Sequence, residues 1–149
     1  MKDIYSYLFV SFLLISVLFF SCSGSVNKNY DKIQKGKYSF IFEDSLGNKL
    51  TEGIFTVESI NFQKVNGVYE VKNMFVDKIN GLNSKGGNFE AQMDSSMKNL
   101  SINMNPKIAD ANLFINAMVK KDSLIGDWYF STMRGKQNPG LFRAWKLSN

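Results

Sequence analysis

The sequence contains no histidine, a single cysteine and only two prolines. Without histidine the chain lacks the commonest general base and metal ligand, and it cannot assemble a serine–histidine relay. The lone cysteine, Cys22, excludes a zinc site built from several thiolates. We therefore expect a protein that is not an enzyme and that holds neither a metal nor a cofactor.

Carboxylates are the catalytic groups that remain. Glu43 and Asp44 are adjacent in the sequence, and on a strand adjacent side chains point to opposite faces. Asp94 stands before Ser95 and Ser96, and this group is read as a turn because one acid falls short of a calcium loop. A glycosidase site would need two acids that converge from different strands, and that alternative stays open.

Cys22 stands directly after an apolar segment at the start of the chain. A short Met1–Asp3 segment is followed by 17 mostly apolar residues, Ile4–Phe20, and then by Ser21. This order resembles the signal peptide of bacterial lipoproteins, except that the family usually has leucine where Phe19 stands. The resemblance implies cleavage before Cys22 and a diacylglycerol on its thiol, which would attach the protein to a membrane. An uncleaved transmembrane anchor stays open, because the segment approaches the ~20 residues that span a bilayer.

The resemblance divides the chain into a signal helix at residues 1–21, a lipidated, flexible tether at residues 22–35 and one domain at residues 36–149. Ser23, where an aspartate would favour the inner membrane, implies delivery to the outer membrane, with the domain facing the periplasm. The formal net charge of +5 favours contact with anionic lipid headgroups, although solubility alone explains it more simply. Because the basic residues are scattered, we expect no nucleic-acid partner.

From Gly36 onward, side chains alternate at the two-residue period of a β-strand. Turn signals such as Asn66-Gly67 and Asn80-Gly81 separate the alternating segments, and Pro106 can begin one helical turn over Lys107–Ala111. The segments are short and no long helix intervenes, which indicates an all-β, eight-stranded antiparallel up-and-down barrel. The expected strands cover Gly36–Glu43, Gly53–Val57, Val68–Val76, Phe89–Met93, Leu100–Met104, Leu113–Val119, Gly126–Met133 and Gly140–Leu147.

A glycine followed by aromatic residues recurs along the chain. Gly36-Lys37-Tyr38-Ser39-Phe40 matches Gly126-Asp127-Trp128-Tyr129-Phe130, and a shorter form appears at Gly53–Phe55, Gly87–Phe89 and Gly140–Phe142. A glycine on the same face as the following aromatic residue relieves crowding where a strand bends, as closure of a small barrel requires. The first and last hairpins are thus variants of one unit, and we expect the first and last strands to pair and Trp128 to be buried.

The Gly126-Asp127-Trp128 triplet and the hairpin spacing resemble the lipocalin and avidin superfamilies. The closing segment, which includes Asn103–Pro106 and Ala109–Asn112, is more similar to the small lipocalin-like barrel lipoproteins of bacteria. Their role is mostly unassigned. Because the glycine-tryptophan signature lies in the last hairpin instead of the first strand, no ligand-binding residue can be carried over from true lipocalins.

An eight-stranded barrel is either filled by side chains or wide enough for one small ligand. We expect a mostly filled core with a ligand cleft, if any, at the open end. One predicted function is that of a lipid-anchored envelope barrel that binds a small apolar or amphiphilic molecule. The other is that of a non-catalytic lipoprotein that docks another envelope component through the outward residues Ile41, Ile54, Tyr129 and Trp145. The candidate ligand-lining residues are Tyr38, Phe40, Phe42, Phe55, Phe89, Trp128, Phe130 and Phe142.

Overall fold

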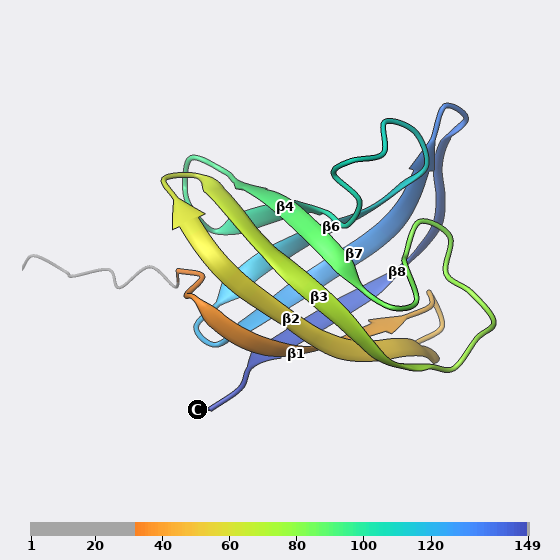
Figure 1. Ribbon diagram of the computed structural model, residues 1–149, viewed down its shortest axis with the longest axis horizontal. Helices are drawn as coiled ribbons and strands as arrows, with labels where there is room; N and C mark the ends of the chain where they lie inside the picture. The colour runs from red at the N-terminus through yellow and green to blue at the C-terminus, as the bar shows by residue number, and fades with distance from the viewer. Residues whose placement is uncertain (1–31, 149) are drawn as a thin grey trace, which may run out of the picture.

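The computed structural model describes residues 32–148, which form a closed antiparallel barrel (Figure 1). Each strand pairs with the next, and β1 closes the barrel on β8 from Tyr38↔Lys146 to Glu43↔Leu141. The eight-stranded up-and-down barrel and the pairing of the first and last strands are therefore confirmed, whereas the signal helix and Cys22 lie outside the described residues. The strands are β1 (Gly36–Glu43), β2 (Lys49–Asn61), β3 (Lys64–Met74), β4 (Gly87–Met93), β5 (Asn99–Asn103), β6 (Asn112–Lys120), β7 (Ser123–Thr132) and β8 (Gly135–Lys146).

The barrel has two dissimilar ends. At the end called here the tether end, β1 begins, β8 finishes and three short turns connect β2 to β3, β4 to β5 and β6 to β7 (Figure 1, left). At the opposite end, called the loop end, the connections run over residues 44–48, 75–86, 104–111 and 133–134. Packing begins before β1, because Ile33 is buried and the Tyr38 hydroxyl donates a 2.9 Å hydrogen bond to the carbonyl of Gln34.

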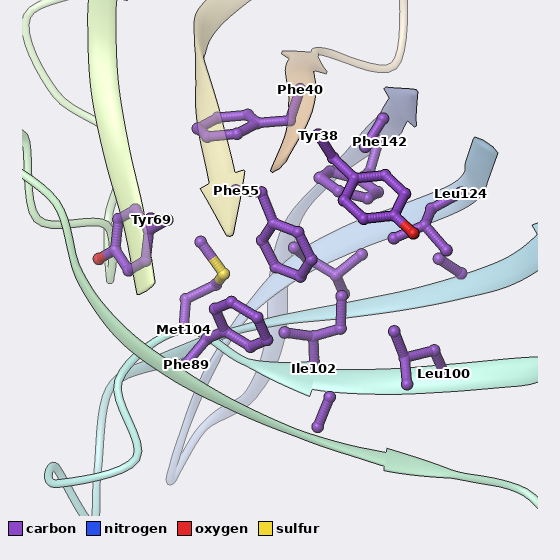
Figure 2. Close-up of a cluster of buried hydrophobic side chains, with 14 of the residues drawn as sticks. Tyr38, Phe40, Phe55, Tyr69, Phe89, Leu100, Ile102, Met104, Leu124 and Phe142 are labelled. Atoms are coloured by element: carbon purple, nitrogen blue, oxygen red, sulfur yellow. The ribbon is translucent and has the colours of Figure 1, made fainter. Parts of the chain in front are cut away.

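Large aromatic side chains fill the barrel interior (Figure 2). The rings of Phe55 and Phe89 stack with centroids 4.0 Å apart, although they come from β2 and β4. Near the seam between β1 and β8, Phe42 packs on Phe142 at 5.3 Å and on Trp128 at 5.6 Å. The aromatic residues of β1, β7 and β8 therefore meet in one cluster, as pairing of the first and last strands predicts.

The glycine-aromatic repeat sets which residues face each other across neighbouring strands. In the β7–β8 ladder Gly126 pairs with Phe142 and Trp128 pairs with Gly140, so each aromatic residue lies opposite the other strand's glycine. A Cβ added to Gly140 would lie 2.5 Å from Nε1 of Trp128, which indicates that the indole occupies the space above the glycine. The repeat thus places large rings in the interior without widening the barrel.

The β3–β4 ladder contains the same reciprocal arrangement, and it corrects one sequence prediction. Asn66-Gly67 is not a turn but lies inside β3, where Gly67 pairs with Phe89 while Tyr69 pairs with Gly87. The turn instead falls between β2 and β3, where Phe62 has a positive φ of 55°. The turn propensity of Asn-Gly does not decide the structure here. The ring of Phe89 on β4 needs a residue without a side chain opposite it, and Gly67 meets that need inside the strand.

Two further expectations were wrong. Alternation along the expected strand Val68–Val76 puts Phe75 on the same face as Tyr69. Tyr69 is buried but Phe75 is 53% exposed, because a bulge opposite Glu52 and Gly53 exchanges the faces near the end of β3. The predicted helical turn over Lys107–Ala111 is not helical, and the bond from the amide of Ile108 to the carbonyl of Asn105 closes only a tight turn.

Candidate functional site

The barrel interior is filled at the predicted ligand-lining positions. Seven of the eight aromatic candidates are buried, and the most accessible of them, Trp128, is only 4% exposed. A cavity of ligand size would leave the rings around it accessible to water, whereas these rings contact one another. The seven buried candidates are Tyr38, Phe40, Phe42, Phe55, Phe89, Trp128 and Phe142. Burial of Trp128 is thus confirmed, and its Nε1 donates a 2.9 Å hydrogen bond to the carbonyl of Glu43.

Phe130 is the one candidate that is only half-buried. A register shift between Trp128 and Phe130 interrupts the β7–β8 ladder, and Phe130 lies beyond it, toward the loop end. A Cβ added to Gly81 would lie 2.8 Å from the Phe130 ring, so the 75–86 loop covers this ring. Phe130 therefore contributes to a lid over the filled core and is not brought together with the other candidates.

The adjacent carboxylates Glu43 and Asp44 take part in an ion pair and in a turn. Glu43 pairs with Arg143 across the β1–β8 seam. Asp44 accepts hydrogen bonds from the amides of Leu46 and Asn48, and the bonds from Asn48 lower its pKa. These interactions give the two adjacent acids separate structural roles.

Asp94 closes the β4–β5 turn, which confirms that Asp94–Ser96 forms a turn. Its carboxylate accepts bonds from the Ser96 hydroxyl and from the Asn99 side chain at 2.7 Å. Slight burial raises the pKa of Asp94, but the bonds from Asn99, Ser96 and the Lys98 amide lower it overall. Within residues 32–148, no group of three or more acidic or thiol side chains is arranged to hold a metal ion.

Two hollows lie on the outer wall of the barrel. The first, about 650 Å³, lies over β4 to β7, and the second, about 240 Å³, lies over β3 to β6. Gln92 and Ser101 line both hollows, and the small side chain of Ser101 separates them only by a shallow ridge. The lining of the first hollow is mainly apolar and includes the exposed side chains of Met118 and Ile125, with Asn99 and Asn116 beside them. Asn66 and Asn103 contribute amide groups to the second hollow.

The loop end displays apolar side chains on each of its four connections. Leu46 is 86% exposed in the β1–β2 turn, and Met133 is 90% exposed in the β7–β8 turn. Phe75 and Val76 project from the β3–β4 loop and Ile108 from the β5–β6 loop. These five residues are called the apolar crown. Exposed apolar residues are ordinary when scattered singly. Their presence on every connection at one end makes that end a candidate interaction surface.

The four outward residues predicted for docking do not form one patch. Ser39 pairs with Ile54 on one side and with Trp145 on the other, so these two side chains flank a small residue on the outer wall. Tyr129 lies elsewhere, on β7, and stacks on Phe114 with centroids 5.7 Å apart. The outer wall therefore carries separate apolar sites, one beside Ser39 and one at Tyr129.

Sequence reasoning missed the apolar crown because it placed Phe75, Val76 and Met133 at the ends of expected strands, whereas β3 ends at Met74 and β7 at Thr132. Leu46, inside the predicted turn Ser45–Lys49, was the available signal, since a large apolar residue is uncommon in an otherwise small and polar turn. Comparison with protein-family models finds no match, and comparison with curated proteins finds no similar chain. Over residues 32–148 there is no helix of sufficient length and apolar character to cross a bilayer.

Proposed function

We propose that this chain is a non-catalytic, lipid-anchored protein of the cell envelope that docks another envelope component through its apolar crown. The observation that carries the proposal is the contrast between a filled interior and an end with an apolar side chain on each connection. Lipid on Cys22 would attach the chain to the membrane on the side of the tether end. The apolar crown, at the opposite end, would then face away from that membrane.

The exposure of the crown residues sets the energy that docking can supply. Full burial of one large apolar side chain contributes about 1.5–3 kcal/mol. Leu46 and Met133 are the most exposed members and have the most surface to bury. A partner with an apolar surface of its own would therefore gain most from contact with these two turns.

Binding of a small apolar molecule, the other predicted function, needs a pocket of about 300 Å³ or more. The seven buried aromatic candidates contact one another and leave no such space between them. The hollow of about 650 Å³ exceeds that limit, but it lies on the outer wall and none of the eight aromatic candidates lines it. The hollow of about 160 Å³ beside Pro106 and Ile108 is smaller than that limit. Docking is therefore the function that the geometry supports better.

The test is site-specific photo-cross-linking of the full chain in its own cells. A photoreactive residue at Met133 should form one discrete adduct, whereas the same residue at Ser101, in the outer-wall hollows, should form none. Leu46→Ser together with Ile108→Ser should abolish the Met133 adduct, and Phe62→Ser at the tether end should leave it intact. An adduct at Ser101 with none at Met133 would move the docking site to the hollows and refute the crown proposal.

A further inference from the structure

The charged side chains of the barrel are distributed unequally between its two ends. The tether end, taken as residues 32–37, 58–64, 94–99, 120–123 and 146–148, carries eight lysines and three acidic residues. The rest of the described chain carries eight basic and eight acidic residues. The whole surplus of five positive charges in residues 32–148 therefore lies at one end. The lysines are Lys32, Lys35, Lys37, Lys64, Lys98, Lys120, Lys121 and Lys146.

We propose that the tether end is a membrane-contact face that rests on an anionic lipid surface, with Phe62 inserted among the headgroups. This inference rests on the proposed function, in which the lipid on Cys22 attaches the domain to the membrane at its tether end. The occupant of this face is a lipid bilayer, to which the lysines are complementary in charge. The exposed Phe62 and the start of β1 lie at the same end of the barrel.

Phe62 supplies an observation independent of charge. It is 81% exposed at the tip of the β2–β3 turn, and its φ of 55° lies in the left-handed region. That region favours glycine and disfavours a bulky side chain. Met97 and Lys121 in the other two tether-end turns have positive φ as well, so the tight turns impose this conformation. An exposed phenylalanine at such a position adds little to the core, whereas an aromatic ring is stabilised at the boundary between headgroups and acyl chains.

The covalent path to the proposed lipid permits this orientation. Ten residues, 22–31, precede the first described residue, Lys32, and a chain of that length spans at most about 35 Å. A strand of about nine residues rises roughly 23 Å along a barrel axis, which exceeds the Debye length of ~8 Å at physiological salt. The surface potential of the membrane would therefore act on the tether end alone.

The experiment uses residues 23–149, so that no lipid on Cys22 contributes. This chain should fold without the first 22 residues, because the barrel closes on itself and contains its own core. Its binding is measured by flotation with phosphatidylcholine vesicles that contain no phosphatidylglycerol or about a third of it, at low and at physiological salt. Binding should require the anionic lipid and weaken as salt rises.

Matched charge reversals locate the contact. Lys120→Glu with Lys121→Glu at the tether end should weaken binding at least about tenfold, because each lysine near the surface contributes about fivefold. Lys78→Glu with Lys85→Glu, exposed in the loop-end connection 75–86, makes the same charge change and should weaken binding less than about twofold. If the first pair lowers the unfolding midpoint, Lys35→Glu with Lys37→Glu takes its place.

A second pair of variants tests the inserted side chain. Phe62→Ser should release the chain from anionic vesicles at physiological salt, and Met133→Ser should not. The opposite result would place the loop end on the lipid and overturn the inference. Equal effects of the two charge pairs, or no binding to anionic vesicles, would overturn it too. Because this chain carries no lipid and the cross-linking uses the full chain, failure here and failure of the proposed function are separate results.

Discussion

Alanine at Gly126 should destabilise the barrel far more than alanine at Gly87, although both glycines lie on strands opposite an aromatic residue. A Cβ on Gly126 would meet three backbone atoms of β6, the nearest being the Asn116 carbonyl oxygen at 1.9 Å. Backbone atoms cannot move aside without separating β6 from β7. A Cβ on Gly87 would meet only the Tyr69 ring, no closer than 3.3 Å, and a ring can shift by a few tenths of an ångström.

The magnitudes follow from that difference. At Gly126, overpacking costs about 1–3 kcal/mol, and each hydrogen bond lost as the strands separate adds about 0.5–1.5 kcal/mol. We expect a total of about 2–4 kcal/mol. At Gly87, alanine stabilises by about 0.4–1 kcal/mol through the unfolded chain, which offsets the ring shift, so the net change should stay within about 1 kcal/mol.

Urea titration followed by tryptophan fluorescence measures both variants. With a slope of about 2 kcal/mol per molar urea, Gly126→Ala should lower the midpoint by roughly 1–2 M and Gly87→Ala by less than about 0.5 M. Gly126→Val should be worse than Gly126→Ala, because its branches add to the same overlap. Equal midpoints for the two alanine variants would refute the reasoning, since β6 and β7 would then have room for a side chain between them.

Three other outcomes follow. Trp128→Ala should cost about 3–5 kcal/mol in urea titration, because it leaves a cavity and an unpaired carbonyl on Glu43. Burial raises the pKa of Tyr38 and of Tyr69 above 10.0. The contribution of these two protonated hydroxyls to the free energy of unfolding is therefore fully present below pH 10 and falls as the pH rises through the raised folded-state pKa values. Tyr38→Phe should accordingly lose less thermal stability between about pH 8 and 10.5 than the wild type. Cells fed labelled palmitate should label the wild type, and Cys22→Ala should accumulate as an unlabelled precursor, whereas an unlabelled wild type that keeps residues 1–21 would favour the transmembrane anchor.

The strands were predictable because one face of each is buried. In β1 the period of two separates Phe40 and Phe42, which are buried, from Ile41, which is half-exposed. That parity fails only where the backbone departs from a regular ladder. The bulge near the end of β3 exposes Phe75. The sequence around it gives no sign that β3 has one more residue than β2 at this point.

The prediction for Gly67 failed for a different reason. Asn66-Gly67 has the local signature of a hairpin turn, but the partner that decides its position is Phe89, on another strand. Only the reciprocal pairing of Gly67-x-Tyr69 with Gly87-x-Phe89 explains why the glycine is there. The sequence contained this repeat unit as well, and the turn interpretation concealed it, because a glycine assigned to a turn is not compared with glycines in strands.

The apolar crown is the feature for which folding offers no explanation. Leu46 and Met133 contribute little to the core, since more than four-fifths of each side chain is exposed, and replacement of such residues usually changes stability by no more than about 0.5 kcal/mol. Polar residues there would serve the turns equally well and would lower the risk of aggregation. An apolar side chain at such a position costs solubility and adds little to stability, and the proposed contact with a partner at the loop end would account for it. A filled barrel suits that role, because close-packed rings hold the four connections in fixed relative positions.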